Sequence, residues 1–352
     1  MTSSDKTQPG NYFEDFTVGQ VLTHATPRTV TDGDVALYTA LYGGRFLLTS
    51  SAEAARAIGF AAQPIDDMLT FHVVFGKTVP DISLNAVANL GYGEGVFGVP
   101  VYAGDTLSAD SEVIGLKENS NGKTGVVYVR STGINQRGET VVSYVRWVMI
   151  NKRDATNAAP DPVLPSLAPT VDVADLHVPD GLDLSAYDTK RAGSPHRFGD
   201  YRVGERIDHV DGTTIEEAEH MMATRLYQNT AKVHFNQFAQ ASGRFGRRLV
   251  YGGHVISIAR ALSFNGLGNA FKIAAINAGT HANPVFAGDT VFAWSEILDA
   301  AEIPGRRDVG AIRVRTVATK DQPTTEHTYK DADGKYLPSV LLDFDYWVLM
   351  PR

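Results

Sequence analysis

Two stretches of the chain share one pattern and together decide the fold. "VPVYAGDTLSADSEVIG" runs from Val99 to Gly115, and "NPVFAGDTVFAWSEILD" runs from Asn283 to Asp299. Both contain Pro-Val, an aromatic residue, Ala-Gly-Asp-Thr and a Ser-Glu pair at the same positions. A pattern that recurs at a fixed spacing indicates a duplicated structural unit.

Two further matches extend the repeat in both directions. "YFEDFTVGQ" at 12–20 resembles "RFGDYRVGE" at 197–205, and "YVRWVMINKR", ending at Arg153, parallels "LDFDYWVLMPR" at the C-terminus. The three matches occur in one order at a nearly constant offset. We therefore predict tandem repeats at 1–153 and 196–352, joined by a linker at 154–195 that is rich in Pro, Ala and Asp.

Each repeat has the pattern of an α+β unit. A polar helix with acidic residues in its first turn is predicted at 31–43 and again at 214–227. A more apolar helix follows at 68–75 and at 255–262. Runs rich in Val, Ile, Tyr and Trp predict antiparallel strands at 125–134, 140–150, 311–318 and 340–350. The simplest architecture is one helix wrapped by a curved antiparallel sheet in each repeat.

Composition excludes several classes of function. The net charge of −8 argues against a nucleic-acid surface, which needs clustered positive charge. The chain has no cysteine, so disulfides, thiolate metal sites and a Cys nucleophile are excluded. The histidines lack metal-ligand spacing, and "GYGEGVFG" at 91–98 lacks the strand-turn-helix context of a phosphate loop. No signal peptide or membrane-length apolar run is present, so we expect a cytoplasmic protein.

Three segments of the second repeat carry a resemblance to a known family. They are "QNTAKVH" at 228–234, "GGHV" at 252–255 and "PVFAGD" at 284–289. In this order they resemble the G-D-x-N-P-x-H, H-G-M-L and P-V-x-x-G-D motifs of the MaoC-like, R-specific enoyl-CoA hydratases. The resemblance implies the hotdog fold, here as a double hotdog, and an acyl-CoA thioester as substrate.

The two-copy form is similar to the mesaconyl-CoA hydratases within this family. That resemblance implies a hydro-lyase that reversibly hydrates mesaconyl-C1-CoA to β-methylmalyl-CoA, in routes such as the ethylmalonyl-CoA pathway. It implies no cofactor beyond the CoA of the substrate, and no metal. We also expect a homo-oligomer, and no nucleic-acid or membrane partner.

The departures from the motifs place the chemistry in the second repeat. In the first repeat, Gly44 and Thr49 stand where the family has its catalytic Asp and His. The second repeat keeps His234, whose imidazole can take and return a proton near neutral pH. Asn229 replaces the Asp and cannot accept a proton as a carboxylate would. It either orients the water and His234, or caps the following turn.

Further candidates follow from the same segments. The backbone amide of Gly253 is unhindered and is suited to donate a hydrogen bond to an oxygen that gains negative charge. The alternative is that the glycine is needed only for the dihedral angles of a turn. Asp66 and Asp67 are candidates for the missing carboxylate, although acids also favour a helix N-terminus. The candidates for substrate binding are Arg244, Arg247, Arg248, Tyr251 and Gly252, because arginines suit the phosphates of CoA and a substrate carboxylate.

Three other functions remain open at this point. The chain could hydrate a different enoyl-CoA, hydrolyse an acyl-CoA as hotdog thioesterases do, or bind acyl-CoA without catalysis. A thioesterase would use a carboxylate such as Asp66 or Asp67 to activate water. Retention of His234 with the paired glycines argues against the non-catalytic binding module.

Overall fold

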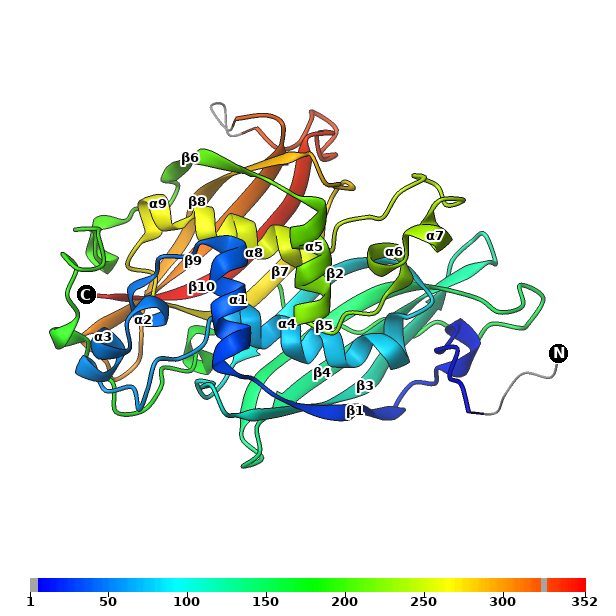
Figure 1. Cartoon of the computed structure of the whole chain (residues 1–352), viewed down its shortest axis with the longest axis horizontal. Coiled ribbons are helices and arrows are strands. Elements are labelled where there is room, and N and C mark those ends of the chain that lie inside the picture. Colours follow the sequence, from blue (N-terminus) through cyan, green and yellow to red (C-terminus); the bar gives the residue numbers. More distant parts are fainter. Residues whose placement is uncertain (1–5, 324–327) are drawn as a thin grey trace.

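The strands of both repeats join in one continuous sheet. The computed structural model describes residues 6–323 and 328–352; residues 1–5, the start of the predicted first repeat, and 324–327 lie outside it. The first repeat contributes β1 (Val21–Thr29), β2 (Ala86–Phe97), β3 (Thr106–Glu118), β4 (Thr124–Ile134) and β5 (Thr140–Asn151). The second contributes β6 (Arg206–Thr214), β7 (Lys272–His281), β8 (Thr290–Glu302), β9 (Val309–Lys320) and β10 (Val340–Pro351). Their order is β1-β3-β4-β5-β2-β7-β10-β9-β8-β6, and neighbouring strands are antiparallel (Figure 1).

Helices of both repeats lie together against one side of this sheet (Figure 1). The first repeat supplies α1 (Asp32–Tyr42), α2 (Leu47–Ser50), α3 (Ala52–Ala57) and α4 (Asp67–Thr78). The second supplies α5 (Glu217–Leu226), α6 (Lys232–Phe235), α7 (Gln237–Gln240), α8 (Gly252–Leu262) and α9 (Phe264–Leu267). The central helices α4 and α8 contact each other, and α1 contacts both α5 and α8. In the described part of the chain, no helix is long and apolar enough to cross a membrane.

The predicted helices and strands are confirmed. Both apolar helices begin earlier than predicted, α4 at Asp67 and α8 at Gly252. The sequence left a turn open as the alternative role of the glycine pair at the start of α8. In the structure both glycines belong to the first turn of the helix.

The seam between the repeats is the pairing of β2 with β7. Tyr92 pairs with Gly279, and Gly95 pairs with Ile276. A Cβ built on Gly95 would lie 2.9 Å from the Cβ of Ile276. The glycine-rich segment 91–98 therefore lies mostly in a strand, where small residues allow the two repeats to approach closely.

The same internal hydrogen bonds occur in both repeats. His24 Nε2 lies 2.8 Å from Ser111 Oγ, and His209 Nε2 lies 2.8 Å from Ser295 Oγ. The turns before β3 and β8 are also alike, because Asp105 and Asp289 each accept a bond from the backbone N–H three residues earlier. This repetition supports a duplicated unit at the level of individual contacts.

The segment predicted as a linker, 154–195, packs on the surface of the protein. It contains the short 3₁₀ turns η3 (Val173–Asp175) and η4 (Leu184–Ala186). Leu184 and Tyr187 are buried in an apolar cluster that also includes Trp347 of β10. The segment is thus held against the sheet by apolar contacts rather than left free. Three further short turns are η1 (Phe13–Asp15), η2 (Val79–Ser83) and η5 (Phe198–Asp200).

Close contact between the repeats at Gly76 yields a first prediction. A Cβ on Gly76 of α4 would lie 1.7 Å from the carbonyl oxygen of Tyr227, whereas one on Gly33 of α1 would meet nothing closer than 3.5 Å. We expect Gly76→Ala to destabilise the fold by about 1–3 kcal/mol or more through overpacking. Gly33→Ala should be neutral or stabilise it by up to about 1 kcal/mol. Equal denaturant midpoints for both variants would contradict this account.

Candidate active site at the start of helix α8

The first turn of α8 presents backbone amides to the candidate site. Tyr251 precedes the helix as its N-cap, and Gly252 and Gly253 are its first two residues. The first amides of an α-helix have no acceptor within the helix and carry its partial positive charge. This end of α8 can therefore stabilise an oxygen that gains negative charge.

Matching hydrogen bonds establish the register between the two repeats at this helix start. Ile65 N–H donates to Val101, and Val250 N–H donates to Val285, so Ile65 corresponds to Val250. Counting on from there, Asp66 corresponds to Tyr251 and Asp67 to Gly252. Gly252 therefore occupies the first helical position, the place that Asp67 holds in the first repeat.

His234 lies beside this helix start on the short helix α6. Its Nδ1 donates to the carbonyl oxygen of Leu249 at 2.8 Å, and its ring packs edge-on against Tyr251, with 5.6 Å between centroids. A neutral imidazole that donates from Nδ1 carries its lone pair on Nε2. Burial lowers the pKa of His234 to about 4, so the ring is neutral at pH 7. It can accept a proton from water at Nε2.

A second imidazole, His281 at the end of β7, reaches the same helix start. A Cβ built on Gly252 would lie 2.4 Å from Cε1 of His281, so this ring occupies the space beside the glycine. Its Nε2 lies 3.1 Å from the hydroxyl of Tyr92, a residue of the first repeat. Burial, and then the nearby His234, lower the pKa of His281 to about 4.

Gly253 faces the opposite side, toward the other central helix. A Cβ on Gly253 would lie 2.3 Å from the ring of Tyr251 and 2.5 Å from Cε1 of His72. His72 of α4 bonds to Ser257 Oγ at 3.1 Å and to the hydroxyl of Tyr251 at 3.3 Å. The glycine is thus required by packing, and an oxyanion role for its amide remains a prediction.

A buried polar network surrounds His254 of α8. The Tyr42 hydroxyl bonds to the Tyr227 hydroxyl at 2.7 Å and to Nδ1 of His254 at 2.8 Å. The Nε2 of His254 is buried without a hydrogen-bond partner. Burial lowers the pKa of His254 to about 3, so the ring stays neutral. Side chains of both repeats therefore support α8.

Asn229 is buried and caps a turn. Its Oδ1 accepts a bond from the backbone N–H of Ala231 at 3.2 Å, which is the turn-capping interaction considered above. This contact leaves the side-chain NH₂ for another partner. Its orientation of water or of His234 remains a prediction.

Asp66 and Asp67 are held by structural contacts. Asp67 bonds to Lys272 Nζ at 2.7 Å and accepts the N–H of Ile273 at 2.8 Å. Asp66 caps α4 by accepting the N–H of Met68, and burial, then the Asp67 carboxylate, raise its pKa. His72 and Phe75 of α4 both contact Tyr251 at the start of α8. At 1.5 Å per residue, Asp66 lies roughly 9 Å from His72 along the helix axis. These contacts favour the structural reading of both acids.

The corresponding place in the first repeat is filled. Thr49, Asp67 and Phe97 occupy the positions of His234, Gly252 and His281, and they surround a cavity of only about 20 Å³. The Thr49 hydroxyl donates to the Phe46 carbonyl. The first repeat therefore has neither imidazole at this place, and the Asp67 side chain occupies the start of its helix.

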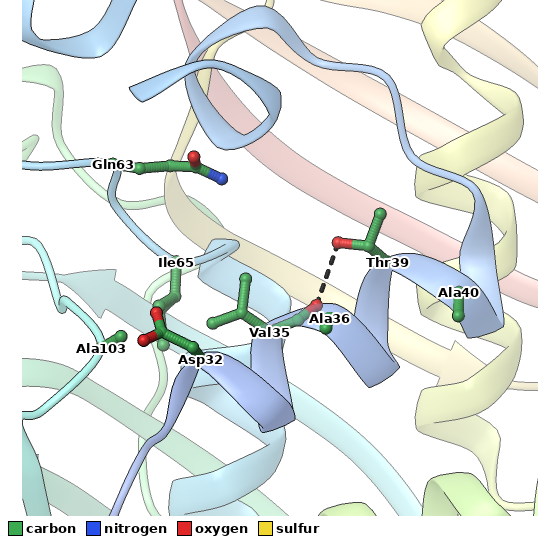
Figure 2. A pocket seen from close by; sticks show the side chains of 8 residues that line it. All are labelled: Asp32, Val35, Ala36, Thr39, Ala40, Gln63, Ile65 and Ala103. Atoms are coloured by element: carbon green, nitrogen blue, oxygen red, sulfur yellow. Dashed lines mark hydrogen bonds between the residues drawn. The ribbon is translucent and has the colours of Figure 1, made fainter. Parts of the chain in front are cut away.

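A second difference between the repeats concerns the groove beside α1. In the first repeat, small side chains leave an open groove of about 500 Å³ beside this helix (Figure 2). Its lining includes Val35 and Gln63, which correspond to His220 and Arg248. In the second repeat both of these residues bond to the Glu217 carboxylate. Nε of Arg248 is a buried donor without a hydrogen-bond partner, and Nδ1 of His220 is a buried acceptor without one, because Nε2 of that ring donates to Glu217.

The other two predicted arginines lie on the surface near this cluster. The Arg247 guanidinium lies 3.9 Å above the ring of Phe286, and that of Arg244 lies 5.1 Å from the ring of Phe245. Both side chains are exposed. Guanidinium groups beside aromatic rings can meet phosphates and a flat base together, so CoA binding remains a prediction for both.

Comparison with known proteins assigns the family. The family model described as mesaconyl-CoA hydratase matches residues 1–330. The chain belongs to the mesaconyl-CoA hydratase family. It is 64% identical to a β-methylmalyl-CoA dehydratase of Chloroflexus aurantiacus, over 99% of both chains. It is 61% identical to a mesaconyl-CoA hydratase of Cereibacter sphaeroides, over 99% of this chain and 100% of the relative.

Solved structures confirm the fold predicted for this mesaconyl-CoA hydratase family member. A MaoC-domain dehydratase from Chloroflexus aurantiacus superposes with a TM-score of 0.97 at 64% identity, over 99% of both chains. A Mycobacterium tuberculosis protein described as a double hotdog gives a TM-score of 0.75 at 25% identity, over 97% of this chain and 98% of that one. The double hotdog architecture and the MaoC-like resemblance are both confirmed.

Sequence reasoning missed several residues of the site. His281, Tyr92, His72 and His220 lay outside the three motif segments, and His254 lay inside "GGHV" without being singled out. One signal was available for His281, because Phe97 stands at the same place before the Pro-Val turn of the first repeat. Within the described chain, no group of three or more Asp, Glu, His or Cys side chains is arranged to hold a metal ion.

The buried histidines predict how stability depends on pH. The pKa is lowered to about 4 for His209, His234 and His281 and to about 3 for His72 and His254, in each case first by burial. Unfolding exposes these rings, which then take up protons near pH 6.5. Stability should therefore fall as the pH drops from about 6.5 toward 4, by up to about 1.4 kcal/mol per pH unit for each group. Thermal melting at pH 7.5, 6.5 and 5.5 measures this, and a constant or rising midpoint would refute it.

Proposed function

We propose that this protein reversibly hydrates mesaconyl-C1-CoA to β-methylmalyl-CoA. The names of its two relatives support this substrate, and the geometry of the second repeat supports hydration. The observation that carries the proposal is the neutral imidazole of His234 beside the free amides of α8. The first repeat has Thr49 in place of this imidazole, so we infer one active site per chain, in the C-terminal repeat.

The proposed reaction needs one base and one site for an oxyanion. Nε2 of His234 takes a proton from water, and the hydroxide oxygen bonds to the alkene carbon remote from the thioester. The π electrons move toward the thioester, so negative charge develops on its oxygen. The first amides of α8 stabilise that charge. The proton on His234 then passes to the carbon next to the thioester, which completes the addition.

Recognition of the free carboxylate distinguishes this substrate from simple enoyl-CoAs. Arg248 is suited to it, because its Nε–H is buried without a hydrogen-bond partner while its terminal nitrogen pairs with Glu217. An unpaired buried donor is costly, so a carboxylate that accepts from it gains affinity over a methyl group. The exposed Arg244 and Arg247 are suited to the phosphates of CoA.

The remaining features of the proposal follow from the chemistry. Hydration changes no oxidation state overall, so we infer no cofactor beyond the CoA of the substrate. We place the enzyme in the cytoplasm as a homo-oligomer.

Replacement of His234 is the central test of the proposed function. We expect His234→Ala to lower kcat for mesaconyl-CoA by about 10²–10⁴, because proton transfer by a positioned base is lost. Thr49→Ala, at the corresponding place in the first repeat, should leave the rate unchanged. The loss of enoyl-thioester absorbance and the release of free thiol are recorded together. Near-normal turnover of the His234 variant would refute the mechanism, and thiol release by the wild type would indicate a thioesterase.

Arg248→Gln tests recognition of the carboxylate. We expect KM for mesaconyl-CoA to rise by about 10- to 100-fold, the value of a charged hydrogen bond, with little change for crotonyl-CoA. Arg191→Gln is a matched control, since Arg191 pairs with an exposed Glu53 on the surface. An equal loss with both substrates would assign Arg248 to structure alone. Wild-type preference for crotonyl-CoA would refute the proposed substrate.

A further inference from the structure

His281 lies where a ligand at the start of α8 would meet it. The face of its ring lies against Gly252, since Cε1 lies 2.4 Å, and Nδ1 and Nε2 each lie 2.6 Å, from the Cβ position of this glycine. The side chain is partly exposed. Any larger residue at position 252 would displace the ring. Gly252 thus places an imidazole next to the helix amides.

The two repeats differ at this place in three residues together. Where the second repeat has His234, Gly252 and His281, the first has Thr49, Asp67 and Phe97. The ring of Phe97 shows that the fold accommodates an apolar aromatic side chain at the end of this strand. Packing alone therefore does not require a histidine at position 281, which points to a chemical role.

The phenol of Tyr92 is a donor suited to Nε2 of His281. Its hydroxyl lies 3.1 Å from Nε2, and burial raises the pKa of Tyr92, so the phenol keeps its proton. A phenol that donates to Nε2 leaves the hydrogen of a neutral imidazole on Nδ1. The Nδ1–H is then a hydrogen-bond donor at the start of α8.

We propose that His281 is a catalytic residue that donates a hydrogen bond from Nδ1 to the thioester oxygen, beside the first amides of α8. This inference rests on the proposed hydration. It assigns His281 to the oxyanion and His234 to the proton of water. Tyr92 is then a positioning residue, contributed by the first repeat to the active site of the second.

A neutral imidazole suits this role better than a charged one. Because the pKa of His281 is lowered to about 4, the ring does not protonate between pH 6 and 8. The positive end of a helix also opposes an imidazolium. A neutral donor stabilises a developing enolate without transferring a proton to it, and such imidazoles beside helix N-termini are known electrophilic catalysts.

Replacement of His281 by the residue of the first repeat tests the proposal. We expect His281→Phe to lower kcat by about 10²–10³, the cost of one lost oxyanion donor. KM should change little, because the lost interaction forms mainly in the transition state. Tyr92→Phe should lower kcat by a smaller factor. His196→Gln, an exposed histidine outside the site, should leave the rate unchanged. A His281→Phe variant that keeps kcat within about threefold of wild type would overturn the assignment.

A binding comparison separates a catalytic from a structural role. Wild type and His281→Phe are each titrated with a saturated acyl-CoA thioester and with the matching CoA thioether, which lacks the carbonyl oxygen. The variant should lose affinity for the thioester alone. Equal losses for both ligands would indicate a structural role and overturn the proposal.

Spectroscopy of the wild type provides a measurement that needs no stable variant. The ¹⁵N spectrum should show His281 with a protonated Nδ1 from pH 6 to 8, and this signal should shift with the thioester but not with the thioether. The opposite tautomer would overturn the proposal. Hydration by the wild type is assayed first, because its absence would refute the proposed function. The thioester and thioether titrations and the ¹⁵N spectrum would then still show whether His281 contacts the thioester.

Discussion

The ladder between β2 and β7 is the contact on which the rest of the structure depends. It joins two five-stranded sheets, and glycines on both strands allow the close approach. Because the strands are antiparallel and belong to corresponding parts of the repeats, the central helices α4 and α8 come together on one side. Every inter-repeat contact described above, including the bond between His72 and Ser257, follows from that arrangement.

This arrangement explains why a degenerate repeat is retained. The first repeat lacks both imidazoles of the site, yet it supplies Tyr92, His72 and Tyr42 as partners for residues of the second. These partners set the orientation of His281, Tyr251 and His254. The chemistry is assigned to one repeat, while the positions of its groups depend on both.

Neutral imidazoles and the N-terminus of α8 set the electrostatic potential of the site. Burial keeps His234, His254 and His281 neutral, so three imidazoles lie near one another without mutual repulsion. The start of α8 is then the principal source of positive potential there, joined by Arg248 at one side. Such a site favours an anionic transition state, because the neutral imidazoles and the helix amides place no negative charge next to it.

The sequence by itself determined the duplication, the α+β double hotdog and the family, and it singled out His234 as a candidate. These features are encoded locally, in periodic apolar patterns and in motifs whose order along the chain is preserved. It did not determine which residues of the first repeat correspond to Gly252 and Gly253. Two short motifs match almost equally well when one of them is shifted by a single residue. The backbone bonds of Ile65 and Val250 decided that register.

Only the tertiary structure showed that Asp67 is paired with Lys272 and that His281 lies against Gly252. Each of these contacts joins residues far apart in the chain. They form because the β2–β7 ladder and the packed helices bring the two repeats together. No local sequence pattern predicts such contacts.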